Sequence, residues 1–244
     1  MLSKTASIIR LQSARALSPS DLASIAQHCA RLGAEDRLDL EATLRLDVQS
    51  EFDARFLAEH LAKQQWTLSA PMSEALEHWL VDEELHQMLF LQVYKAAFPA
   101  RYEDLQRDLA QLGQNVVIEP LKQLMADEFE VLCLMAYDKL TTVKAYQALL
   151  PQYFLLGPRM EPLLRMVIRD EGRHYATFAR ILRMHHAQRL SETPAQLEKI
   201  RSNEGTPYAN TFVLDHDCGI WTDFIFDRSV SQLKRALGQA RDSA

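Results

Sequence analysis

The sequence contains the pattern D-E-x-x-H twice, once from Asp82 to His86 and once from Asp170 to His174. On an α-helix, residues i and i+3 lie on one face about one turn apart, so each copy directs a carboxylate and an imidazole the same way. Two such pairs on facing helices are the ligand arrangement of a dinuclear metal site inside a helical bundle. Because the chain has only eight histidines, the repeat strongly constrains the fold. It predicts a bundle whose helices present these pairs to each other.

The remaining sequence favours helices throughout. Seven glycines in 244 residues is a low count, and the residues that dominate are the helix formers Ala, Leu, Gln, Glu and Arg. We therefore predict an all-α fold in a single domain, residues 1–244. Long helices are expected at about 37–65, 71–97, 120–150 and 162–189. They would form a four-helix bundle core at about 37–190, with additional helices in an N-terminal extension (1–36) and a C-terminal extension (191–244).

Proline and glycine positions set the expected limits of these helices. Pro120 suits the first turn of the third long helix, and Pro151 is expected to follow its end. The segment 191–207 is polar and rich in turn-forming residues, which predicts a connection without a long helix.

Composition excludes several classes of function. The net charge is −6 and no cluster of Lys and Arg stands out, so nucleic-acid binding is not expected. No apolar stretch reaches the roughly 18 residues of a membrane span, and residues 1–11 contain no apolar signal-peptide region. Cys29, Cys133 and Cys218 are odd in number and widely spaced, which argues against a disulfide framework. These features together predict a cytoplasmic protein.

The glutamate and histidine of each motif interrupt a stripe of apolar residues that should face the core. Glu83 and His86 lie among Leu76, Trp79, Phe90 and Val93, and Glu171 and His174 lie among Leu164, Val167, Phe178 and Ile181. A buried carboxylate is costly unless it is paired, protonated or bound to a metal. The alternative interpretation is a structural, hydrogen-bonded Glu–His pair; its occurrence twice favours metal ligands.

Two further carboxylate ligands are expected from the other two long helices. Glu51 precedes the turn near residues 65–69 by about as many residues as Glu83 follows it, so an antiparallel hairpin places the two side by side. The same argument around 151–157 places the partner of Glu171 near residues 137–139, where Asp138 lies. Glu130 is the competing candidate. In another alternative, Asp138 pairs with Lys139 or Lys144 in solvent.

The aspartate that precedes each motif glutamate has a different predicted role. Asp82 and Asp170 could each accept a hydrogen bond from the second ring nitrogen of the histidine on the opposite helix, which would orient a metal-bound imidazole. The alternative is that both are solvent-facing acids. Four carboxylates and two neutral imidazoles balance two divalent cations, and these ligand types suit iron or manganese.

These residues resemble the ferritin-like di-iron carboxylate superfamily, over about residues 37–190. The resemblance rests on Glu51, the Asp138 region and the two motif segments, which are similar to those of bacterial ribonucleotide reductase small subunits and AurF-type arylamine oxygenases. Aspartate replaces the third-helix glutamate of the superfamily. Phe90 stands one turn after His86, where the reductase subunit stores a tyrosyl radical, so radical storage of that type is not expected.

The resemblance implies a ferritin-like bundle with two iron ions, or a manganese–iron pair, bound by Glu51, Glu83, His86, Asp138, Glu171 and His174. It further implies an oxygenase or oxidase that oxidises a small organic substrate with O2 and receives electrons from an external donor. Such a protein could form a homodimer. The alternatives are an iron-oxidising or metal-storage protein and an interaction protein that keeps the motif as a buried polar network. His216, Asp217 and Cys218 form a compact cluster whose role the sequence leaves open.

Overall fold

The computed structural model describes residues 17–64, 66–114, 119–204 and 222–238. Every regular element in these ranges is helical, which confirms the predicted all-α class. The four long helices are α3 (Ala34–Leu61), α4 (Ala70–Ala97), α6 (Glu128–Phe154) and α7 (Met160–His185). The shorter elements are α2 (Pro19–Ala30), η1 (Pro99–Arg101), α5 (Tyr102–Gln114), η2 (Glu119–Leu124), η3 (Ala187–Glu192), α8 (Thr193–Arg201) and α9 (Asp223–Gly238).

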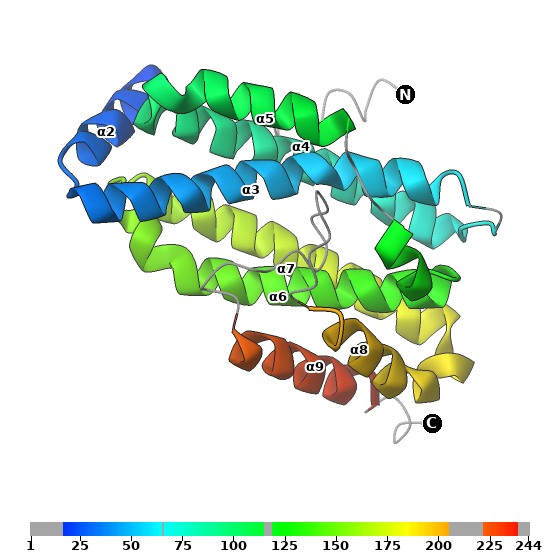
Figure 1. Cartoon of the computed structure of the whole chain (residues 1–244). Helices are drawn as coiled ribbons and strands as arrows, with labels where there is room; N and C mark the ends of the chain where they lie inside the picture. The colour runs from blue at the N-terminus through cyan, green and yellow to red at the C-terminus, as the bar shows by residue number, and fades with distance from the viewer. Residues whose placement is uncertain (1–16, 65, 115–118, 205–221, 239–244) are drawn as a thin grey trace.

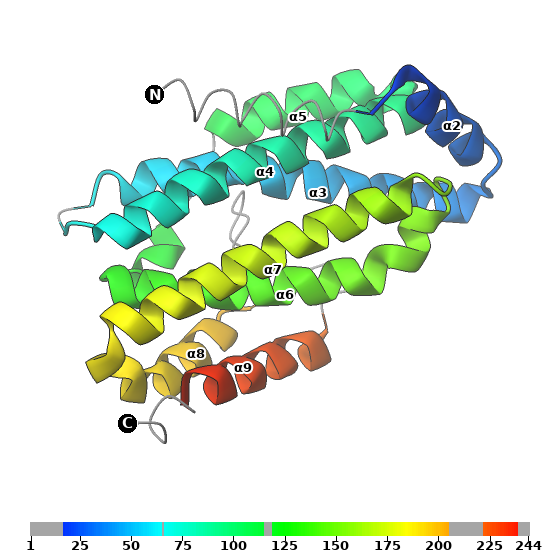
Figure 2. The same ribbon diagram turned by 180° about the vertical axis from the view of Figure 1, so that it is seen from behind.

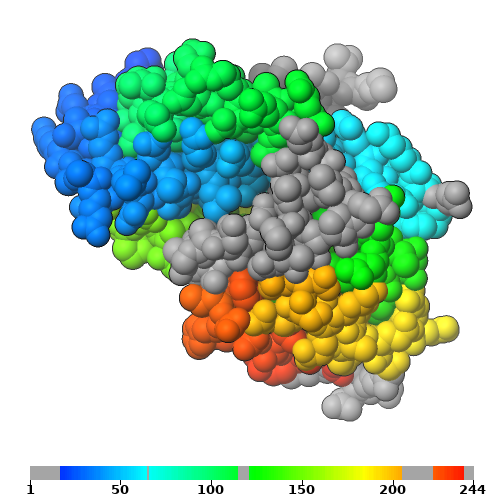
Figure 3. Space-filling model, in the orientation of Figure 1, coloured from blue at the N-terminus to red at the C-terminus, as the bar shows by residue number. Residues whose placement is uncertain are grey.

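The long helices form two antiparallel hairpins, α3–α4 and α6–α7, which pack on each other through α4 and α7 (Figure 1). At the periphery, α2 contacts α4 and α5 contacts α3, while α8 and α9 pack on α6 (Figure 2). In the space-filling view, α5 and α3 form one edge of the visible face, and α8 and α9 form the opposite edge (Figure 3). The helix α6 therefore has neighbours on opposite sides.

The sequence of α6 accounts for its central place. All residues from Val131 to Leu140 are buried, so this part of the helix has no solvent-facing side. A helix that is apolar all round belongs inside a larger core. Asp138 and Lys139, which lie within this run, are consequently buried whichever way they point.

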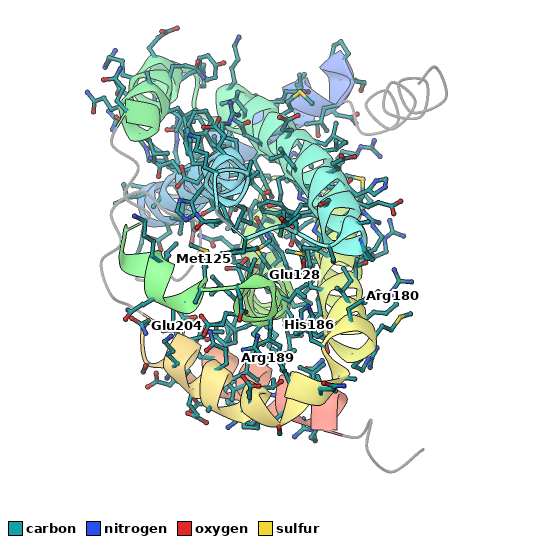
Figure 4. All side chains as sticks on the ribbon, turned by 90° about the vertical axis from the view of Figure 1, so that its right-hand side faces the viewer. Met125, Glu128, Arg180, His186, Arg189 and Glu204 are labelled. Atoms are coloured by element: carbon teal, nitrogen blue, oxygen red, sulfur yellow. The ribbon has the colours of Figure 1, made fainter. Side chains whose placement is uncertain are left out.

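The first turn of α6 corrects the predicted helix start. Asp127 caps the helix by accepting a hydrogen bond from the amide of Glu130, so α6 begins at Glu128, and Pro120 falls in the short 3-10 helix η2. The carboxylate of Glu128 accepts hydrogen bonds from the backbone amide of Ser69 and from His186 Nε2. Figure 4 shows this end of the bundle, where the start of α6 meets the end of α7.

One other expectation about helix limits was wrong. The helix α6 continues through Pro151 to Phe154, because a proline near a helix end removes only one backbone hydrogen bond. The segment after α7 contains only the short helices η3 and α8 as far as residue 204, in agreement with the expected connection without a long helix. Pro194 suits the first turn of α8, and Leu197 and Ile200 share its buried face. Gly157, with φ of 99°, makes the turn from α6 to α7.

The apolar core is divided into two clusters at opposite ends of the bundle. One contains Leu57, Trp79 and Phe178 and extends to α8 and α9, and the other contains Leu44, Phe90 and the first half of α7. None of the helices in the described ranges is long and apolar enough to span a membrane.

Candidate metal centre

A layer of buried polar residues lies between the two apolar clusters. On α3, Glu51 falls between Val48 of one cluster and Ala54 of the other. The pairs Glu83/His86 on α4 and Glu171/His174 on α7 occupy the same level. Each of these five side chains is at most 5% exposed. We call Glu51, Glu83, His86, Glu171 and His174 the carboxylate–histidine centre.

Helical spacing explains how each motif contributes two groups. Glu83 and His86, and likewise Glu171 and His174, are separated by one turn and lie on the face that α4 and α7 turn toward each other. The two imidazole rings face one another with their centroids 6.5 Å apart. The hairpin α3–α4 brings Glu51 level with this pair, at the register expected from the sequence.

The geometry divides the centre into two halves that share Glu171. In the His86 half, Nδ1 of His86 lies 3.5 Å from Glu51 Oε2 and 3.3 Å from Glu171 Oε1. In the His174 half, Nδ1 of His174 lies 3.4 Å from Glu83 Oε1 and 3.6 Å from Glu171 Oε2. Each histidine thus faces two carboxylates from different helices.

Asp82 and Asp170 hold the outer nitrogens of the two rings. His86 Nε2 donates to Asp170 Oδ2 at 3.3 Å, and His174 Nε2 donates to Asp82 Oδ2 at 3.1 Å. Arg173 links the two aspartates with hydrogen bonds of 2.8 Å to Asp170 and 2.7 Å to Asp82. These crossed hydrogen bonds are the ones anticipated from the sequence, and they leave both Nδ1 atoms directed into the centre.

Lys139 is the residue that sequence reasoning missed. Its ammonium lies 3.2 Å from Glu83 Oε2, 3.3 Å from Glu171 Oε2 and 3.6 Å from Asp138 Oδ2, and it is 2% exposed. Asp138 is buried beside it, so the alternative of an Asp138–Lys139 pair in solvent is wrong. The only available signal was the long apolar run of α6, which buries both residues.

Tyr146, also on α6, is a second residue that the motif analysis missed. Its hydroxyl donates to Glu51 Oε1 at 2.9 Å, and its ring stacks on Phe90 with centroids 5.8 Å apart. Tyr146 lies two turns after Lys139 on the same face of α6, so the helical period relates the two residues that contact the centre from this helix. The rival ligand Glu130 is elsewhere, in the first turn of α6, where it accepts the amide of Ala126.

The pKa shifts show how strongly these charges interact. Burial and the neighbouring charge of Glu171 raise the pKa of Glu83 well above its usual range. Burial by itself would raise the pKa of Glu171, but the ammonium of Lys139 and the two histidines hold it well below that range. Burial would lower the pKa of His86, but the charge of Glu51 and the hydrogen bond to Asp170 raise that pKa well above its usual range. The carboxylates of this layer therefore stabilise positively charged groups that lie next to them.

The polar atoms of the centre fit a bound cation. Six of them are buried and make no hydrogen bond: Glu51 Oε2, Glu83 Oε1, His86 Nδ1, Glu171 Oε1, Glu171 Oε2 and His174 Nδ1. Of these six, Glu171 Oε2 is paired with the Lys139 ammonium, 3.3 Å away. Such atoms are costly in an apolar interior unless they have a partner, and a metal ion would be one. Ligand atoms of Glu51, Glu83, His86 and Glu171 lie within 4.8 Å of one another, so these four residues could hold a metal ion.

The two other predicted ligands lie outside that group of four. Asp138 lies against Lys139, and His174 lies on the far side of Glu171. Their predicted ligand roles therefore remain predictions. His216, Asp217 and Cys218 fall outside the described residues.

No protein-family model matches the chain, and neither a curated protein nor a solved structure matches it. The interpretation of the centre therefore depends on its own geometry and chemistry.

Proposed function

We propose that this chain is an iron-dependent oxidoreductase that uses O2 to oxidise a small organic substrate. The observation that carries the proposal is the buried group of Glu51, Glu83, His86 and Glu171, which places ligand atoms from three helices within 4.8 Å of one another. Carboxylate and imidazole ligands suit iron or manganese, and the ligand set contains no thiolate. Iron bound there would supply the redox chemistry with O2 that protein side chains lack.

The surrounding residues suit this role because they fix the ligands and exclude water. Asp170 sets the orientation of the His86 ring, and Arg173 fixes Asp170 in turn. Tyr146 fixes one oxygen of Glu51 and leaves the other directed at His86. The apolar clusters on both sides separate the centre from bulk solvent. A dry, preorganised centre of this kind limits side reactions of an oxidising metal.

We further propose that an external donor supplies the electrons that the reduction of O2 requires. Cys29 and Cys133 are buried free thiols, which suits the reducing conditions of a cytoplasm.

Oxygen consumption tests the proposal. Protein loaded with Fe(II) under anaerobic conditions is mixed with O2, and uptake is followed with an oxygen electrode. We expect faster consumption than by the same concentration of free Fe(II), and loss of this excess in Glu171→Ala. The matched control is Glu84→Gln, which changes an exposed acid in the same motif of α4.

A rate no faster than that of free Fe(II) would contradict the proposal, as would an unchanged rate in Glu171→Ala. The metal-storage alternative predicts instead many irons per chain and a cage-sized assembly by size-exclusion chromatography.

A further inference from the structure

The position of Lys139 bears on how many metal ions the centre can bind. Its ammonium contacts Glu83 Oε2 and Glu171 Oε2 at 3.2 and 3.3 Å, from the α6 side. It also lies 5.6 Å from the centre of the Trp79 ring. Lys139 and Trp79 are 2% and 0% exposed. The ammonium therefore cannot reach solvent unless the bundle opens.

A second metal ion in the His174 half, bound between His174 Nδ1, Glu83 Oε1 and Glu171 Oε2, would need one oxygen that Lys139 already contacts, Glu171 Oε2. In the His174 half, the available ligand atoms include His174 Nδ1 and Glu171 Oε2. An ion bonded to Glu171 Oε2 at about 2.1 Å would lie within about 5.4 Å of the Lys139 ammonium, since that oxygen is 3.3 Å from Nζ. Two cations so close in a buried site repel each other strongly.

The His86 half presents ligand atoms that face one another at short distances. Nδ1 of His86 lies within 3.5 Å of both Glu51 Oε2 and Glu171 Oε1, and these atoms make no hydrogen bond. Together with Glu83, these residues form the group of mutually close ligands.

We infer that the centre binds one metal ion, in the His86 half, and that the ammonium of Lys139 takes the place of a second. This inference rests on the proposed metal-binding function and differs from the expectation of two ions. Lys139 is then a positioning residue whose positive charge neutralises part of the charge of Glu83 and Glu171.

Metal content tests the inference without any measurement of activity. The full-length protein is freed of metal with a chelator, loaded with excess Fe(II) under anaerobic conditions, desalted and analysed by inductively coupled plasma mass spectrometry. We expect one iron per chain in the wild type. In Lys139→Met, which keeps the side-chain length without the charge, we expect two. Lys144→Met on the same helix is the matched control and should remain at one.

Loading with Mn(II) gives a second reading from the wild type alone, should Lys139→Met fail to fold. A single ion predicts a six-line electron paramagnetic resonance signal that accounts for one spin centre per chain. A spin-coupled pair, or two irons per wild-type chain, would overturn the inference, as would one iron per chain in folded Lys139→Met.

The outcomes also separate this inference from the proposed function. Two irons with rapid O2 consumption would contradict only the inference. One iron without O2 consumption would contradict only the proposed oxidation. A folded wild type that retains no metal would contradict both.

Discussion

The hydrogen bond from each histidine to an aspartate on the facing helix fixes which ring nitrogen is free. For His86, the donor is Nε2 and the acceptor is Asp170, so Nδ1 remains as the ligand atom. In Asp170→Asn, the amide can no longer act as a charged acceptor for this N–H. We expect metal affinity to fall about 10- to 100-fold, measured by titration of the metal-free protein with Co(II) or Fe(II).

Asp82→Asn provides the matched comparison, because Asp82 makes the equivalent bond to His174. If one ion binds in the His86 half, this substitution should change affinity far less than Asp170→Asn. Equal losses in the two variants would contradict the assignment of the ion to the His86 half.

Tyr146 acts on the opposite side of the same half. Its hydroxyl is the donor to Glu51 Oε1, and Tyr146→Phe removes that donor while it keeps the ring stacked on Phe90. We expect a metal affinity about tenfold lower with an unchanged circular dichroism spectrum, because Glu51 becomes free to rotate. Tyr153→Phe alters the other tyrosine packed on Phe90 and should leave affinity unchanged. An equal effect in both variants would indicate a packing change instead.

The residues of the centre differ in how far the sequence could reveal them. Glu51 was found because hairpin register depends only on counting from a turn. The same counting led to positions 137–139 on α6 but selected Asp138 as the group facing Glu171, whereas Lys139 is the residue in contact with it. Lysine is not a usual metal ligand, so a pattern of ligand types does not point to Lys139. The residues next to Asp138 and Lys139 on α6 are mostly apolar on every side of the helix. The sequence therefore shows no periodicity from which to decide which of these two side chains points toward the centre.

The side chain of Glu128 joins the start of α6 to the start of α4 and the end of α7. Glu128 accepts the amide of Ser69, which caps α4, and the Nε2–H of His186, which ends α7. Glu128→Gln keeps the shape of the side chain but removes its negative charge. We expect a free energy of unfolding lower by about 1–2 kcal/mol at pH 7, measured by urea denaturation.

The loss of unfolding free energy in Glu128→Gln should depend on pH. Burial by itself would raise the pKa of Glu128, but the amide of Ser69 and His186 lower it below its ordinary value of 4.5. A lowered pKa in the folded state stabilises the protein fully above the unfolded value, and this contribution declines as the pH falls below about 4.5. The wild type and Glu128→Gln should therefore converge in stability toward acid pH. Glu161→Gln, which alters a half-exposed ion pair with Arg165 on α7, should show little effect at any pH.

Helix limits were predictable where a capping residue and a change of hydrophobic period coincide. The start of α4 after Ser69 and the start of α2 after Ser18 meet this condition. The start of α6 does not, because Pro120 gives a plausible first turn seven residues before the true cap, Asp127. Leu121 and Leu124 of η2 are buried in the same apolar cluster as residues distant in sequence, a contact that the local sequence does not reveal.

Across the whole molecule, the polar layer separates two apolar cores that would otherwise be continuous. Buried charges of this density oppose folding unless they are paired, so the layer weakens the bundle at mid-height. Lys139 and Arg173 compensate part of the charge from α6 and α7. A metal ion would compensate more, and its ligands come from α3, α4 and α7, so binding should stabilise the assembled helices.

Thermal unfolding measures this coupling. A ligand that binds only the folded state adds about 2.7 kcal/mol at a concentration 100-fold above its Kd, which corresponds to a Tm increase of about 5–10 °C in a chain of this size. We expect such an increase when Fe(II) is added under anaerobic conditions, and its reversal by a chelator.

Variants make the thermal result specific to the centre. Glu171→Ala removes the carboxylate shared by both halves, so its Tm should not respond to metal. Glu84→Gln should respond as the wild type does. Lys139→Met is the informative case: without metal it lacks the internal cation and should unfold at a lower temperature, yet it should gain more from added metal. If its response equalled that of the wild type, Lys139 and the metal would not share the same carboxylates, and the ammonium would serve only to stabilise the fold.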